Sequence, residues 1–166
     1  MDLILWRHAE AEILSEDGDD LSRQLTSKGE RQAARMAEWL DRSLPEGTRV
    51  LVSPAKRTAQ TAQALGRKYK LRDELVPESS VDDALGLLKW DPVLGPQVKG
   101  PVLFVGHQPY LGQIVSRLLG MKDEICSIRK GSAWWLRTRM REGKFQTVLM
   151  TVVSPELISR SWVDPS

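Results

Sequence analysis

Three short apolar runs, each followed at once by polar residues, constrain the fold of this chain more than any other feature. They are Leu3–Trp6, Val50–Val52 and Val102–Val105, and a helical pattern follows each of them. Apolar runs without alternation are typical of strands that are buried on both faces. Strands that alternate with helices predict an α/β fold, here a three-layer arrangement with a central, mostly parallel mixed sheet flanked by helices.

The helix starts carry their own signals. Ser27 and Glu30 have the spacing of a capping box, and the apolar residues after them, at 33, 36, 37 and 40, recur with a helical period. After the second run, Ser53-Pro54 predicts an N-cap followed by proline at the first helical position. Arg57 is then expected in the first turn of that helix.

Charged or titratable residues stand where the apolar runs end. Arg7 and His8 directly follow the first run, and His107 follows the third after one glycine. The carboxyl ends of parallel strands share one edge of a sheet, and helix N-termini favour anions. We therefore expect Arg7, His8, Arg57 and His107 to converge at that edge.

The rest of the chain completes one domain. Residues 136–141 alternate in polarity, and Glu142–Lys144 predicts a turn that leads into residues 145–153, so a late β-hairpin is expected. Residues 91–101, rich in proline and glycine, predict a surface connection. A length of 166 residues favours a single domain spanning 1–166.

Composition excludes several functions. The formal net charge is +2, without the clustered basic residues that nucleic-acid binding requires. No run approaches the roughly 20 apolar residues of a membrane span, and the N-terminus lacks the pattern of a signal peptide. The single cysteine, Cys126, can form neither an intrachain disulfide nor a thiolate metal site. We expect a cytoplasmic protein that binds no nucleic acid and no membrane.

The predicted cluster suits phosphoryl chemistry. His8 and His107 are the only histidines of the chain, so any imidazole chemistry must use them. Arginine can bind phosphate oxygens in bidentate fashion, and a neutral histidine can attack phosphorus as a covalent nucleophile. His8 follows a rigid central strand directly and is the better nucleophile, whereas His107 is placed as a supporting donor.

Four segments together resemble the histidine phosphatase (phosphoglycerate mutase-like) superfamily. The resemblance extends from residue 3 to about residue 119, in family order, and its first segment has the form found in the short phosphohistidine phosphatase, or SixA-type, branch. The segments are Arg7-His8-Ala9-Glu10-Ala11, Leu25-Thr26-Ser27-Lys28-Gly29, Ser53-Pro54-Ala55-Lys56-Arg57-Thr58-Ala59-Gln60-Thr61, and Gly106-His107-Gln108-Pro109.

The resemblance implies roles for individual residues. His8 becomes phosphorylated, and Arg7, Arg57 and His107 form the rest of the phosphate pocket. Arg23 matches an arginine of the short branch and adds a further phosphate contact. No metal or organic cofactor is implied.

Two departures from the family pattern matter. Ala9 stands where the broader family has glycine, so we expect an ordinary backbone conformation there. Family members that act on alcohol phosphates usually place a Glu or Asp, which protonates the leaving oxygen, in the segment that here lies between Arg57 and His107. The candidates here are Glu78, Asp82 and Asp83, and none stands in a convincing motif. A phosphohistidine substrate removes this need, because imidazole is a far better leaving group than an alkoxide.

We therefore expect a phosphatase with a phosphohistidine enzyme intermediate, acting on phosphohistidine of a phosphorelay or phosphotransfer protein. Only about 30 residues separate Leu71 from Gly100, too few for a covering domain, so an open site is expected. One alternative is a small-molecule phosphomonoesterase that uses Glu78 or a nearby carboxylate as general acid. Others are a phosphate-binding module without turnover and a mutase. The sequence leaves the oligomeric state undetermined.

Overall fold

The computed structural model describes residues 1–158 and contains one six-stranded sheet, ordered β3-β2-β4-β1-β5-β6. The pairs β3-β2, β2-β4 and β4-β1 are parallel, whereas β1-β5 and β5-β6 are antiparallel. The predicted mixed, mostly parallel sheet is thus confirmed. The strands are β1 (Asp2–Arg7), β2 (Arg49–Val52), β3 (Lys70–Leu71), β4 (Val102–Gly106), β5 (Ala133–Arg141) and β6 (Lys144–Val153).

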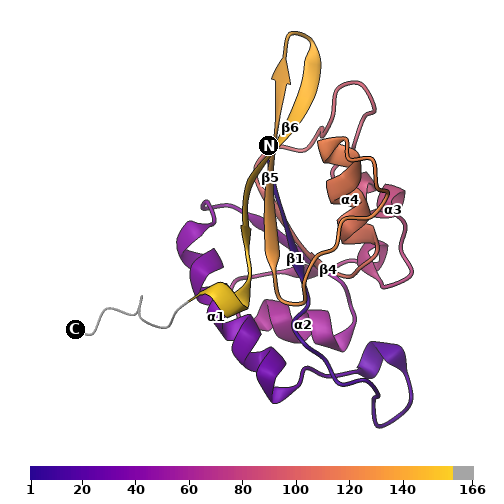
Figure 1. The fold of residues 1–166 in the computed structure, drawn as a ribbon, viewed down its shortest axis with the longest axis vertical. Coiled ribbons are helices and arrows are strands. Elements are labelled where there is room, and N and C mark those ends of the chain that lie inside the picture. Colours follow the sequence, from indigo (N-terminus) through magenta and orange to yellow (C-terminus); the bar gives the residue numbers. More distant parts are fainter. Residues whose placement is uncertain (159–166) are drawn as a thin grey trace, which may run out of the picture.

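Helices cover both faces of this sheet, as Figure 1 shows: α1 and α2 lie on one face, and α3 and α4 lie on the other. Their bounds are Ser27–Ser43 for α1, Lys56–Gln63 for α2, Val81–Gly86 for α3 and Tyr110–Leu119 for α4. Three short 3-10 turns complete the described elements: η1 (Asp20–Ser22), η2 (Asp73–Leu75) and η3 (Pro155–Leu157).

Strand β1 shows why the sheet needs two helical layers. Leu3 and Leu5 pack into the core beneath α3 and α4, and Ile4 and Trp6 pack into the core beneath α1 and α2. All four are buried, as the apolar run predicts. Burial on both faces fixes the strand firmly, so the residues at its carboxyl end start from a rigid support.

The predicted β-hairpin is present at the end of the chain. Strands β5 and β6 pair across a two-residue turn in which Glu142 and Gly143 have φ of 50° and 75°. Such a turn requires left-handed backbone at both positions, which glycine adopts at little cost. The hairpin extends beyond the rest of the sheet (Figure 1). Within residues 1–158, no helix is both long and apolar enough to cross a membrane.

Two helix starts differ from the sequence prediction. The N-cap of α1 is Thr26, whose hydroxyl accepts from the Gly29 N–H, so the predicted Ser27 cap is wrong by one residue. The reason is a tertiary contact, since the Thr26 N–H donates to the Glu10 carbonyl at 3.0 Å. Helix α2 begins at Lys56 and not at Pro54, and Ser53 does not cap it. Arg57 still lies in its first turn, as predicted.

Candidate active site

Main-chain pairing at the carboxyl ends of β1, β2 and β4 brings the predicted residues to one edge. The His8 N–H donates to the Gly106 carbonyl at 3.1 Å, and the Ser53 N–H donates to the Val105 carbonyl at 3.0 Å. His107 directly follows β4. The strand ends therefore place His8, Ser53 and His107 side by side.

His8 is held as a neutral imidazole. Only 6% of the residue is exposed, and its Nδ1 lies 2.7 Å from the Ala9 carbonyl oxygen. A carbonyl can only accept, so we assign the proton to Nδ1, which leaves the lone pair of Nε2 free. Lys89 and Glu142 are the positive-φ residues other than glycine in the described chain, so Ala9 has the ordinary backbone expected of it.

His107 is the second imidazole of the pair, with its ring centroid 5.3 Å from that of His8. Its Nε2 lies 2.8 Å from the Ser53 hydroxyl, and this hydroxyl accepts from the Ala55 N–H at 3.3 Å. We assign this hydroxyl as the donor to Nε2, which places the ring proton of His107 on Nδ1. His107 is thus prepared to donate from Nδ1.

Electrostatics keep both rings uncharged at neutral pH. Burial lowers the pKa of His8 to about 3, and the positive charges of Arg57 and Arg7 act in the same direction. Burial likewise lowers the pKa of His107 to about 2, with further contributions from His8 and Arg57. A neutral His8 is a nucleophile, whereas a protonated one is not.

Two arginines provide the positive charge of the site. Arg57 is 4% exposed, and Arg7 donates from Nη1 to the Ile128 carbonyl at 2.7 Å. The Nε atoms of Arg7 and Arg57 and the Nδ1 of His107 are buried and have no hydrogen-bond partner in the described part of the chain. Buried donors are normally satisfied, so three of them in one cluster fit an anion with several acceptor oxygens.

The remaining predicted site residues lie in different surroundings. Arg23 donates to the Asp20 carboxylate at 2.9 Å and to the Glu12 carbonyl at 2.7 Å, which ties it to η1. Glu78 is exposed in the turn after η2, and no hydrogen bond or ion pair within residues 1–158 joins it to the four cluster residues.

The other two acid candidates have structural partners. Asp83 completes the capping box of α3 with Ser80, and Asp82 pairs with Arg117 of α4 at 2.6 Å. Neither carboxylate is hydrogen-bonded to the histidine pair in the described chain.

Two contributors to the cluster were not identified from the sequence. The sequence predicts Ser53 as a helix cap, but α2 begins three residues later, at Lys56, and no sequence pattern indicates that the Ser53 hydroxyl lies against His107. Asp20 binds Arg57 across 37 residues. The only local signal for Asp20 was its position three residues before Arg23, which is common on any polar surface.

Residues 71–100 add no covering domain over the site. The segment that contains Asp20 contacts Arg57, and the Ile128 carbonyl accepts from Arg7.

Comparison with known proteins gives matches over most of the chain. The family model for the histidine phosphatase superfamily (branch 1) matches residues 3–82. The phosphohistidine phosphatase SixA homolog of Haemophilus influenzae is 30% identical over 141 residues, which cover 75% of this chain and 81% of that protein. The phosphohistidine phosphatase SixA of Escherichia coli K12 is 31% identical over 121 residues, covering 71% and 74%.

A solved structure has the same fold. The protein histidine phosphatase SixA complexed with tungstate superimposes with a TM-score of 0.72 and 24% identity, covering 93% of this chain and 97% of that one. Three findings together define a phosphohydrolase: the fold, the pair of histidines with arginines around it, and the matches to known proteins. The chain belongs to the histidine phosphatase superfamily, and its relatives place it in the SixA-type branch.

Proposed function

We propose that this protein hydrolyses phosphohistidine on another protein through a phosphorylated His8. The observation that carries the proposal is the fixed state of His8, whose Nδ1 donates to the Ala9 carbonyl and whose Nε2 keeps its lone pair. Two relatives with 30% and 31% identity bear the name phosphohistidine phosphatase, which supports the substrate class.

The reaction has two displacements. His8 Nε2 attacks phosphorus, the bond from phosphorus to the substrate nitrogen breaks, and the phosphoryl group moves to His8. The substrate ring leaves as neutral imidazole when its other nitrogen is already protonated. Water then attacks the phosphoryl group, which leaves as orthophosphate while His8 recovers its lone pair. Arg7, Arg57 and His107 Nδ1 donate to the phosphoryl oxygens and stabilise their charge.

The acidic residue in contact with Arg57 favours a substrate with a good leaving group. The carboxylate in contact with Arg57 is Asp20, which hydrogen bonds from Arg23 and Arg57 keep ionised by lowering its pKa. An ionised carboxylate cannot protonate a departing alkoxide. Phosphohistidine does not require such a donor, because imidazole has an ordinary pKa near about 6.5.

The test compares purified wild type with His8→Ala. A radiolabelled phosphodonor should give acid-labile, alkali-stable labelling of wild type, and phosphohistidine should be hydrolysed, whereas His8→Ala should show neither. Persistent labelling of His8→Ala would show that another residue is the nucleophile.

Glu78→Gln distinguishes the proposal from a phosphomonoesterase. We expect unchanged turnover of phosphohistidine, because Glu78 is exposed and no hydrogen bond or ion pair in the described chain joins it to the cluster. If wild type turns over an alkyl phosphate faster than phosphohistidine, and Glu78→Gln loses only the alkyl phosphate activity, a small-molecule ester is the substrate.

A further inference from the structure

Asp20, the first residue of η1, binds two arginines at once. Its carboxylate accepts from Arg57 Nη2 at 3.0 Å through one oxygen and from Arg23 Nη1 at 2.9 Å through the other. Its main-chain carbonyl accepts from Arg57 Nη1 at 2.8 Å. One residue therefore provides acceptors for both terminal nitrogens of Arg57.

Two contacts of this kind fix the plane of a guanidinium group. Because the group is planar, anchoring both Nη atoms also fixes the direction of the Nε–H. Arg57 is 4% exposed, so it has little room for another rotamer. Its Nε is buried and has no partner in residues 1–158. The contacts with Asp20 thus use one end of Arg57 and leave the other available.

The position of Arg23 follows from the same carboxylate. Its Nε donates to the Glu12 carbonyl at 2.7 Å, and its Nη1 donates to Asp20. Two guanidinium groups near one another repel, and an ionised carboxylate between them reduces this repulsion. Asp20 therefore allows a second arginine to lie beside the buried one.

We propose that Asp20 is a positioning residue that orients Arg57, and links Arg23 to it, for binding of the phosphoryl group. This inference rests on the proposed function, because it assumes that the buried donors receive a phosphoryl group. A competing role would have Asp20 occupy the phosphate position and inhibit the enzyme. The contacts favour positioning, since the buried Nε atoms and His107 Nδ1 receive no acceptor from Asp20.

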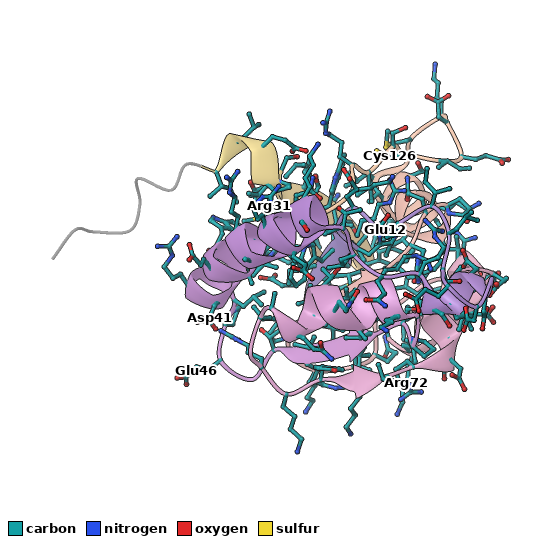
Figure 2. All side chains as sticks on the ribbon, turned by 90° about the horizontal axis from the view of Figure 1, so that it is seen from below. Glu12, Arg31, Asp41, Glu46, Arg72 and Cys126 are labelled. Carbon is teal, nitrogen blue, oxygen red and sulfur yellow. The ribbon has the colours of Figure 1, made fainter. Side chains whose placement is uncertain are left out.

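The experiment uses Asp20→Asn, which keeps a carbonyl acceptor, and Asp20→Ala, which removes both side-chain acceptors. The matched control is Asp41→Asn. Asp41 holds Arg67 in the same way, with its carboxylate and its main-chain carbonyl each 2.9 Å from a guanidinium nitrogen. Figure 2 shows Asp41 near the end of α1, away from Glu12, whose carbonyl accepts from Arg23.

Turnover of any phosphodonor that wild type accepts is measured together with orthophosphate affinity by calorimetric titration of the folded protein. For Asp20→Ala we expect kcat to fall about a hundredfold, the usual scale for a misplaced group, and for Asp20→Asn about tenfold. Orthophosphate affinity should fall in the same order. Asp41→Asn should match wild type in both.

The outcomes separate the possibilities. Tighter orthophosphate binding by Asp20→Asn would show a competing carboxylate, and unchanged kcat and affinity, with or without a lower melting temperature, would show a merely structural residue. Either result overturns the inference. If wild type itself neither binds orthophosphate nor releases it from a phosphodonor, the proposed function fails instead.

Discussion

At the scale of single residues, the two buried histidines make the stability of the protein depend on pH. Their pKa values in the folded state, about 3 for His8 and about 2 for His107, lie below the ordinary value near about 6.5. Between these limits the unfolded chain binds protons that the folded chain does not. The free energy of unfolding is therefore fully retained above about pH 6.5 and decreases as the pH falls.

We expect each histidine to remove about 1–2 kcal/mol of stability between pH 6.5 and pH 5. In His8→Gln the free energy of unfolding should decrease by only about half as much as in wild type over this interval, since one of the two titrating histidines remains. Urea unfolding at the two pH values measures both proteins. An identical pH dependence in wild type and His8→Gln would mean that His8 titrates normally in the folded protein.

The Ser53 hydroxyl is a second feature of this scale. It lies 2.8 Å from His107 Nε2, and without it neither tautomer of His107 is preferred by that contact. We expect Ser53→Ala to lower kcat about tenfold, which corresponds to about 1.4 kcal/mol, the usual contribution of one hydrogen bond. Steady-state kinetics with a phosphodonor provides the measurement.

Ser116→Ala is the matched control for this substitution. Ser116 is a buried serine in α4 whose hydroxyl contacts Met121, so its loss should leave kcat unchanged. Equal kcat values for Ser53→Ala and wild type would show that the contact between Ser53 and His107 does not contribute to catalysis.

At the scale of elements, the start of α1 depends on a close approach between chain segments. A Cβ on Gly29 would collide with the carbonyl oxygen of Glu10, which also accepts from the Thr26 N–H. We expect Gly29→Ala to lower the free energy of unfolding by about 1–3 kcal/mol, the usual cost of overpacking. Gly86→Ala in α3 meets nothing within 4 Å and should be neutral or slightly stabilising.

Urea denaturation midpoints of the two variants test this expectation. If Gly29→Ala were as stable as Gly86→Ala, the contact between the α1 start and Glu10 would be looser than the structure shows.

The same close contacts explain which elements could be predicted from sequence. Strands β1, β2 and β4, the helices that follow them and the hairpin have strong periodicity, so the sheet and its two layers were predicted correctly. The helix starts were not, because Thr26 and Ser53 are held by residues distant in sequence, Glu10 and His107.

The candidate site divides in the same way. His8 and His107 follow directly from strand ends, so their proximity could be predicted from topology. The pairing of Asp20 with Arg57 depends on how an irregular segment folds back, and no periodic pattern encodes it.

At the scale of the whole molecule, the site joins segments that lie far apart in sequence. Arg7 ends β1 and His8 follows it, Arg57 lies in the first turn of α2, and His107 follows β4, so the arrangement exists only when the sheet has formed. A ligand that binds only this arrangement stabilises the folded chain by mass action. Orthophosphate should therefore report on the integrity of the fold.

We expect orthophosphate at about one hundred times its dissociation constant to raise the free energy of unfolding of wild type by about 2.7 kcal/mol. Arg57→Ala should lose most of this increase, because it removes a buried charge from the pocket. Arg67→Ala, which removes an arginine paired with Asp41, should keep it. Unfolding is followed in urea with chloride added to equalise ionic strength. An equal increase in all three proteins would show that phosphate acts through exclusion from the protein surface, and the three buried donors would then need another ligand.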